Sequence, residues 1–259
     1  MIDPGSATII AAGITASATI VTIIIRKTPK KPDAAQKMGT AVRKSMDENF
    51  GFSADAIHSK AEVLNSDGDV KVTRGCRGIK LKPGFMMAHI PAVKVFVSTP
   101  GGSIKNGPNL ITHKEFPKDI SLVTSRKTAT ECIYQIQIPT ILTSNEPPLD
   151  YEVETEFSKA VLMSREAVDK AYTNDLFKRD YFSVDAEFPM EDVEIEITFP
   201  EGLAVTTFGT VFLLHSETLE DSEFQRVKKG FERTNRGARF KIHRPTVGFR
   251  YAIYWSMPK

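Results

Sequence analysis

The hydrophobic and polar positions divide the chain into an uncharged apolar segment and a much longer charged region. Residues 5–25 contain no charged side chain, and Asp3 is the only one before Arg26. In a helix, these residues at about 1.5 Å each reach roughly 31 Å, close to the hydrocarbon thickness of a bilayer. A helix satisfies its own backbone polar groups in lipid, so the many β-branched residues do not argue against one. The pattern predicts a transmembrane helix within residues 1–27.

The charges that flank this segment predict its orientation. No basic residue precedes it, and four follow it closely: Arg26, Lys27, Lys30 and Lys31. Basic residues stay on the cytoplasmic side, so we expect a single-pass inner-membrane protein with its N-terminus outside and the remainder in the cytosol. The alternative is a cleaved secretory signal, for which Ala16-Ser-Ala18 would be the cleavage site. A signal peptide needs a basic region before its apolar core, and here the bases come after it.

A row of small and hydroxylated residues follows one face of the predicted helix at a spacing of four and three. Its members are Thr8, Ala12, Thr15, Thr19 and Thr22. Small residues let transmembrane helices approach closely, and the segment contains no leucine. One interpretation is that the threonine hydroxyls bond back to the helix backbone and simply pack helix against helix. The other is a parallel homo-oligomer in which this row lines a narrow polar pore.

Residues 28–50 are predicted to form a linker and an amphipathic helix. Pro29 and Pro32 interrupt the first helix, and Asp33 with Gln36 three residues later forms a capping-box pattern. The predicted helix ends near Asn49, and four of its apolar residues fall on one face: Ala35, Met38, Val42 and Met46. A helix of this kind would lie along the bilayer or pack against its copies around an oligomer axis.

After about residue 60 the period of the apolar residues changes to two, which is typical of strands. The strand-like segments are 70–73, 78–82, 92–97, 132–138, 193–199, 211–214, 238–242 and 251–255. Pro147-Pro148 is the candidate boundary between a first β-rich region, 51–148, and a second, 149–259, which opens with a short helix near 158–176. We therefore expect one transmembrane helix and a mainly β cytosolic region, an antiparallel sandwich or barrel with one or two short helices.

Composition and motifs limit the chemistry of this region. Hydrophobic residues make up 41% of the chain and charged residues 25%, as in ordinary globular proteins. Two cysteines, Cys76 and Cys132, provide neither a disulfide framework nor a four-ligand zinc site. The sequence contains no P-loop, GxSxG or HExxH motif. We expect no enzymatic activity, no metal site and no cofactor.

The net charge of +2 hides an uneven distribution. Residues 146–201 are acidic, whereas 226–250 are basic and interleaved with the aromatic residues Phe231, Phe240 and Phe249, with Tyr251 next. Basic side chains with nearby aromatic rings suit a single-stranded nucleic acid or another polyanion. The candidate contacts are Arg233, Arg236, Arg239, Lys241 and Arg244.

Two other interpretations of these bases remain open. In the first, the bases occupy the solvent-facing positions of strands whose aromatic residues belong to the core. In the second, the bases form ion pairs with the acidic segment of a neighbouring subunit. A second basic stretch lies in the first β-rich region, with Lys71, Arg74, Arg77, Lys80 and Lys82.

The layout resembles that of small membrane effectors of bacterial anti-phage defence. The closing segment, Arg244-Pro-Thr-Val-Gly-Phe-Arg-Tyr-Ala-Ile-Tyr-Trp-Ser-Met-Pro258, is similar to the endings of bacterial conflict proteins. The Hailong channel effectors are the family it resembles most in architecture. That resemblance implies a membrane channel below a cytosolic crown that binds inhibitory single-stranded DNA made by a partner nucleotidyltransferase. It also implies that the threonine row is the pore face and the basic C-terminal segment a DNA contact.

Two functions follow from these observations. The first is a homo-oligomeric membrane effector, a pore or ion channel gated by the β-rich sensing domain through an anionic nucleotide or nucleic-acid signal. The second is a membrane-tethered adaptor or binding module in which the helix is only an anchor. Both interpretations need the bilayer as a partner, and only the first needs the chain to associate with itself.

Overall fold

A computed structural model describes most of the chain after residue 49. The described residues are 50–97, 99–111, 120–171, 180–203, 205, 207–214, 225–226 and 230–257. The predicted transmembrane helix, with Thr8, Ala12, Thr15, Thr19 and Thr22, lies outside them, as do the flanking Arg26, Lys27, Lys30 and Lys31 and the predicted amphipathic helix. Among the described residues, no helix combines the length and apolar character needed to cross a membrane.

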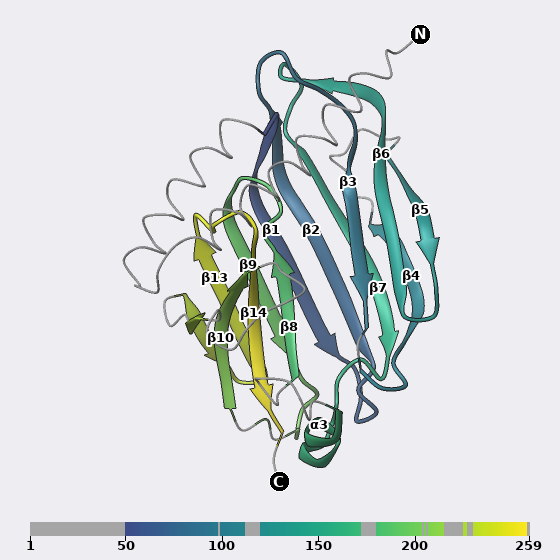
Figure 1. Cartoon of the computed structure of the whole chain (residues 1–259), viewed down its shortest axis with the longest axis vertical. Coiled ribbons are helices and arrows are strands. Elements are labelled where there is room, and N and C mark those ends of the chain that lie inside the picture. The colour runs from purple at the N-terminus through teal and green to yellow at the C-terminus, as the bar shows by residue number, and fades with distance from the viewer. Residues whose placement is uncertain are drawn as a thin grey trace, which may run out of the picture.

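The largest sheet has seven strands in the order β12-β13-β9-β1-β2-β7-β4 (Figure 1). Their bounds are β1 Phe52–Val63, β2 Val70–Leu81, β4 Ser103–Ile111, β7 Leu149–Ser158, β9 Met190–Thr198, β12 Phe231–Thr234 and β13 Gly237–His243. Strand β1 is central and contacts β2 in an antiparallel ladder and β9 in a parallel one. Strands from both sides of Pro147-Pro148 are therefore hydrogen-bonded in a single sheet.

Two smaller antiparallel sheets and one short helix complete the described fold. One sheet has the order β11-β10-β14-β8 and the other β3-β6-β5. Their bounds are β3 Met86–Phe96, β5 Ser121–Lys127, β6 Glu131–Thr143, β8 Asp180–Asp185, β10 Thr207–Leu214, β11 Gln225–Arg226 and β14 Phe249–Ser256. Helix α3 spans Arg165–Ala171. The Ser164 hydroxyl accepts a hydrogen bond from the Ala167 amide at 3.2 Å, as an N-cap residue does.

The mainly β, largely antiparallel architecture with a short helix is confirmed for the described residues. Details differ from the sequence-based expectation. The predicted segments 70–73 and 78–82 fall on one strand, β2, which ends at Leu81 and in which the register shifts between Cys76 and Ile79. Gly78 adopts a φ of 65° at this shift, a conformation that a side chain disfavours. The helix begins at Arg165 rather than near residue 158, because strand β7 extends to Ser158.

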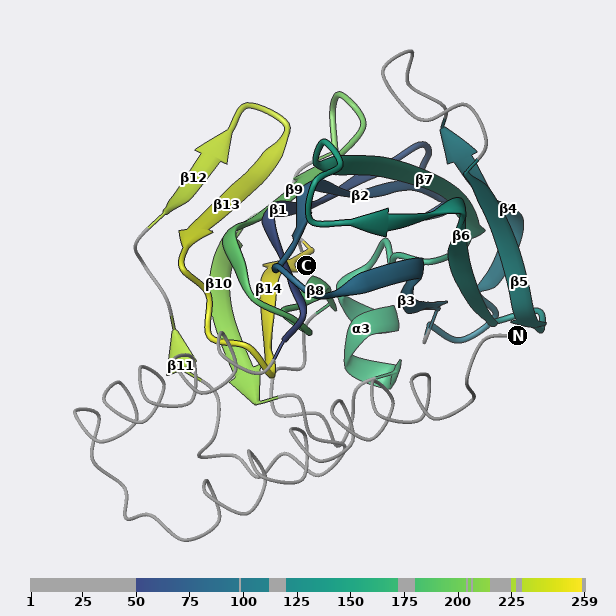
Figure 2. The same cartoon turned by 90° about the horizontal axis from the view of Figure 1, so that it is seen from above.

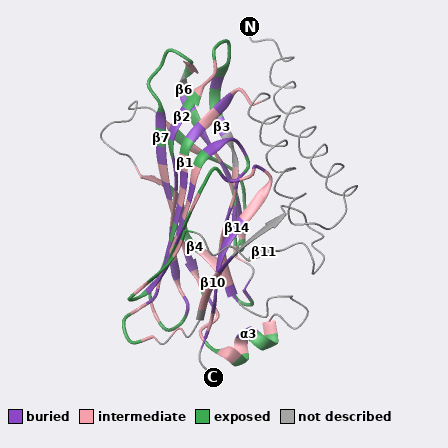
Figure 3. Ribbon diagram, turned by 90° about the vertical axis from the view of Figure 1, so that its left-hand side faces the viewer, coloured by how far each residue is buried: buried purple, intermediate pink, exposed green. Residues whose placement is uncertain are grey.

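The core lies between the large sheet and the two smaller ones. Viewed from above, strands β3, β8 and β14 lie on one side of the arc formed by β13, β9, β1, β2 and β7 (Figure 2). Buried residues line the strands, and exposed residues gather in the loops at both ends (Figure 3). Along β9, Val193, Ile195 and Ile197 are buried and alternate with partly exposed acidic residues. This alternation places apolar side chains inside and charges outside.

Candidate functional site

The outer face of strands β9 and β13 carries the predicted basic residues opposite carboxylates. Alternation along β13 turns Ala238 and Phe240 into the core, so Arg239, Lys241 and His243 face outward. Their partners in the antiparallel register are Glu196 opposite Arg239, Glu194 opposite Lys241 and Asp192 opposite His243. We call these six residues the β9–β13 charge ladder. Opposite charges directly across a strand pair stabilise that pair.

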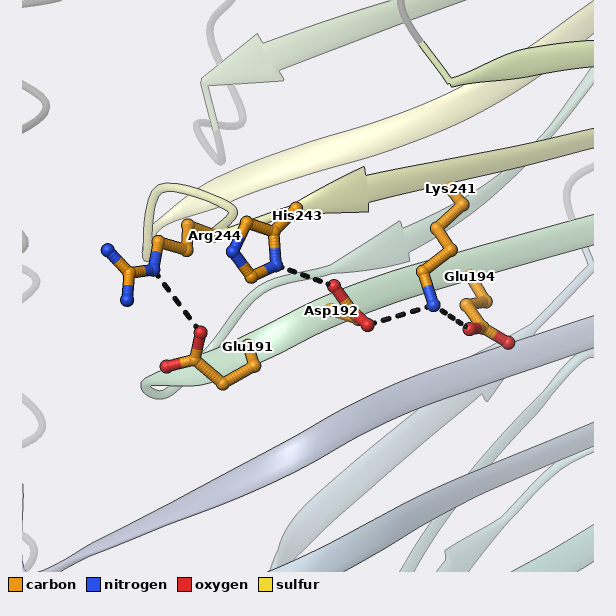
Figure 4. Close-up of polar contacts among 6 residues, drawn as sticks. All are labelled: Glu191, Asp192, Glu194, Lys241, His243 and Arg244. Carbon is orange, nitrogen blue, oxygen red and sulfur yellow. Dashed lines mark hydrogen bonds and ion pairs between the residues drawn. The ribbon is translucent and has the colours of Figure 1, made fainter.

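Ion pairs join most members of this ladder (Figure 4). Lys241 Nζ lies 2.7 Å from Glu194 Oε1 and 2.9 Å from Asp192 Oδ2. His243 Nδ1 lies 3.0 Å from Asp192 Oδ1. Beyond the end of the ladder, Arg244 Nε lies 3.3 Å from Glu191 Oε2. The acidic and basic segments therefore meet within one chain, and the positive field of β13 is largely compensated.

The pKa values in this ladder follow the same contacts. Partial burial raises the pKa of Asp192, but hydrogen bonds from Lys241 and His243 outweigh that effect and lower it overall. Hydrogen bonds to Glu194 and Asp192 raise the pKa of Lys241. Both shifts favour the charged form, so Asp192 and Lys241 stabilise each other as an ion pair.

The other two predicted contacts, Arg233 and Arg236, lie near the β12–β13 turn and bond to backbone carbonyls. Arg233 donates to the Val205 carbonyl at 3.3 Å, and its guanidinium lies 5.6 Å from the centre of the Phe208 ring. Arg236 Nε donates to the Phe199 carbonyl at 3.0 Å. A carbonyl does not neutralise a guanidinium, so the turn remains more basic than the ladder beside it.

The aromatic residues interleaved with these bases are mostly core. Phe240 is 0% exposed and Tyr251 is 3% exposed, and their ring centres lie 6.5 Å apart. The Tyr251 hydroxyl accepts a hydrogen bond from the Thr246 amide at 2.8 Å. Neither ring is available to stack on a nucleotide base, so the interpretation of these two residues as core is the correct one.

The second basic stretch does not form one surface. Lys71 pairs with Glu154 at 2.7 Å and Lys80 with Asp55 at 2.9 Å, both on the outer side. Arg74 instead shares the inner face of β2 with the buried Val70 and Val72. Sequence reasoning missed this interior arginine, because an arginine in an alternating strand is normally assigned to the solvent side.

The two thiols and the described carboxylates give no sign of redox or metal chemistry. Cys76 and Cys132 are free and buried, and burial raises the pKa of both thiols. Low reactivity is expected for a cysteine in such surroundings. Among the described residues, no group of three His, Cys, Asp or Glu side chains is arranged to hold a metal ion.

Comparison with known proteins gives only distant similarity. No family profile and no curated protein sequence matches the chain. One similar solved structure is a mutant two-domain M1 zinc metallopeptidase bound to L-tryptophan, with 7% identity over 79% of this chain and 43% of that one, and a TM-score of 0.34. Another is an M1 zinc metallopeptidase mutant from Deinococcus radiodurans bound to a tripeptide substrate, with 7% identity over 80% and 43%, and a TM-score of 0.35. The chain spans less than half the length of these structures, and similarity at this level assigns neither a family nor an activity.

Proposed function

We propose that this protein is a homo-oligomeric single-pass membrane effector in antiviral defence, whose helices form an ion-conducting bundle gated by the β-rich domain. The observation that carries this proposal is the row of Thr8, Ala12, Thr15, Thr19 and Thr22 in a leucine-free apolar segment. Polar hydroxyls at heptad spacing in a parallel bundle would face a shared axis and form a narrow hydrated path.

The position of β1 supports a link between the domain and this bundle. Strand β1 begins at Phe52, only about 25 residues after Arg26, and runs through the middle of the seven-stranded sheet. A ligand that prefers one arrangement of the domain would shift the population of open bundles by its difference in affinity for the two states.

The pore is tested by replacing Thr15, Thr19 and Thr22 together with leucine. We expect the variant to insert in the membrane but to lose conductance by about an order of magnitude or more, because an apolar constriction dewets. Planar-bilayer recording of the purified full chain and growth on induction measure this loss. The particle mass in detergent must also exceed that of one chain.

The matched control replaces Ile14, Ile20 and Ile23, which occupy mostly other faces of the helix, with leucine. Because these side chains are expected to meet lipid, conductance should stay close to that of wild type. Undiminished current in the threonine variant, or a monomeric particle, would contradict the pore. Membrane association without conductance in the wild type would instead favour the tethered binding module.

We further propose that the signal is an anionic nucleic acid that contacts the domain at Arg233 and Arg236 and at the neighbouring members of the predicted set, Arg239, Lys241 and Arg244. The support for this part is the β12–β13 turn, where the two guanidiniums have carbonyl partners rather than carboxylates. The partly exposed Phe231 lies on the same hairpin.

Reversing Arg236 and Arg239 to glutamate is expected to weaken the binding of a single-stranded oligonucleotide. Each lost phosphate contact lowers the salt dependence of the binding constant by about 0.7 in the log–log slope. Fluorescence anisotropy at several salt concentrations measures both quantities. Reversal of Lys80 and Arg126, which lie on β2 and β5, is the control and should have little effect. Absence of oligonucleotide binding by the wild type at low salt would overturn this part alone.

A further inference from the structure

A cavity of about 140 Å³ lies where the three sheets meet. The large sheet contributes apolar side chains from β1, β2, β7 and β9, among them Val72, Phe157 and Ile197. Residues at the end of β3 and on β8 and β14 complete the lining, together with Ala160 and Val161. The charged ladder described above plays no part in this space, because it occupies the opposite face of β9.

Two residues of the cavity lining each carry a buried donor that has no acceptor within the described part of the chain. One donor is Nε1 of Trp255, whose side chain is 2% exposed. The other is Nε of Arg74, whose Nη2 donates to the Ser183 carbonyl at 3.2 Å. The Trp255 ring is held against Phe199, with ring centres 5.5 Å apart. Buried donors in folded proteins nearly always have an acceptor, so two without one in the lining of a single cavity are unusual.

The cavity lining contains three cations, Arg74, Lys94 and Arg250, and two carboxylates, Asp180 and Asp185. Asp180 accepts hydrogen bonds from the amides of Leu162 and Tyr181, at 2.9 and 3.1 Å. Arg250 forms two hydrogen bonds to Asp185, at 2.7 and 3.1 Å, and Lys94 pairs with Glu131 at 2.8 Å. No described carboxylate pairs with Arg74. The wall therefore combines one unpaired cation, a second unbonded donor and a largely apolar surface.

We infer that this cavity binds a small organic anion with a compact apolar body, of the aromatic carboxylate class. The carboxylate would accept hydrogen bonds from Arg74 and Trp255, and the body would lie against Val72, Phe157 and Ile197. The volume is suitable, because a protein cavity of about 150 Å³ accommodates benzene. This inference stands independently of the proposed function.

Ion pairing gives no reason to keep an arginine at this position, because no described carboxylate pairs with Arg74. Replacing a buried, poorly compensated charge with an apolar side chain of similar size is often neutral or stabilising. An Arg74→Met variant should therefore melt at the same temperature as wild type or higher while it loses the ligand. A purely structural arginine would give the opposite change in melting temperature.

The test is calorimetric titration of the full-length chain in detergent with benzoate. Trp255 is the only tryptophan of the chain, so its fluorescence reports binding in the same sample. We expect saturable binding that weakens about tenfold or more in Arg74→Met, because a hydrogen bond to a charged group is lost. Trp255→Phe, followed by calorimetry, should weaken binding by about threefold to tenfold. If Arg74→Met fails to fold, the loss of affinity in Trp255→Phe still tests the inference.

Matched controls distinguish the contribution of the ligand's charge to the affinity from that of its apolar body. Lys94→Met removes a cation of the same cavity that already has a carboxylate partner, and it should change the affinity by less than about threefold. Benzyl alcohol has the same body without the charge, and acetate has the charge without the body, so both should bind much more weakly than benzoate. The inference is overturned by absence of saturable benzoate binding, by equal affinity in Arg74→Met, or by equal affinity for either analogue.

Discussion

Replacing Phe240 with alanine is expected to lower the free energy of unfolding by about 3–5 kcal/mol. Phe240 is fully buried on the inner face of β13, and its ring lies 6.5 Å from that of Tyr251 on β14. Alanine removes this apolar surface and leaves a cavity that the surrounding sheets fill only partly. Urea unfolding of the full-length chain, followed by circular dichroism, measures the change in midpoint at constant slope.

Phe231 provides the matched control, because it lies directly opposite Phe240 on β12 and is only partly buried. Its replacement by alanine should cost less than half as much. If Phe240→Ala instead left stability unchanged and abolished oligonucleotide binding, the ring would be a stacking platform and its assignment to the core would be wrong.

Replacing Asp185 with alanine is expected to destabilise the fold by about 2–3 kcal/mol. Asp185 accepts two hydrogen bonds from Arg250, and both side chains are only about one quarter exposed. The change removes the carboxylate and leaves a mostly buried guanidinium without that charge partner. Because some solvent reaches the pair, the expected loss is below that of a fully buried one. Thermal and urea unfolding both measure it.

The exposed pair of Arg244 and Glu191 is a direct comparison within the same chain. Its side chains are 66% and 51% exposed, so Glu191→Ala should cost less than about 1 kcal/mol. Equal losses for Asp185→Ala and Glu191→Ala would mean that burial adds nothing to the first pair.

The sequence pattern identifies strands well in this chain, because apolar residues alternate wherever one face of a strand is core. In β9 and β13, the alternation of apolar and charged residues matches the observed alternation of buried and solvent-facing side chains. The same signal is present in β7, where Tyr151, Val153 and Phe157 are buried, but the polar Thr155 at the buried position between Val153 and Phe157 interrupts the apolar alternation. The parallel pairing of β1 with β9 was beyond prediction, because it joins segments more than a hundred residues apart.

For the candidate sites too, local features could be predicted from the sequence, whereas contacts between distant segments could not. The basic residues of β13 could be placed on its outer face from spacing alone, but their carboxylate partners depend on which strand lies beside them. Arg74 and Trp255 come together through β2 and β14 from different sheets, and nothing in their local sequence indicates it. When the role of a residue depends on a neighbour that is distant in the sequence, that role can be assigned only after the strand order is known.

The central position of β1 has a mechanical consequence. Its antiparallel ladder with β2 extends from Phe52 to Val63, and its parallel ladder with β9 covers most of the same length. A pull on the chain at Phe52 along the strand must shear both ladders together rather than break them one pair at a time. Strand β1 would therefore resist being pulled out of the sheet. Under the proposed function, a membrane segment N-terminal to β1 would move together with the whole sheet.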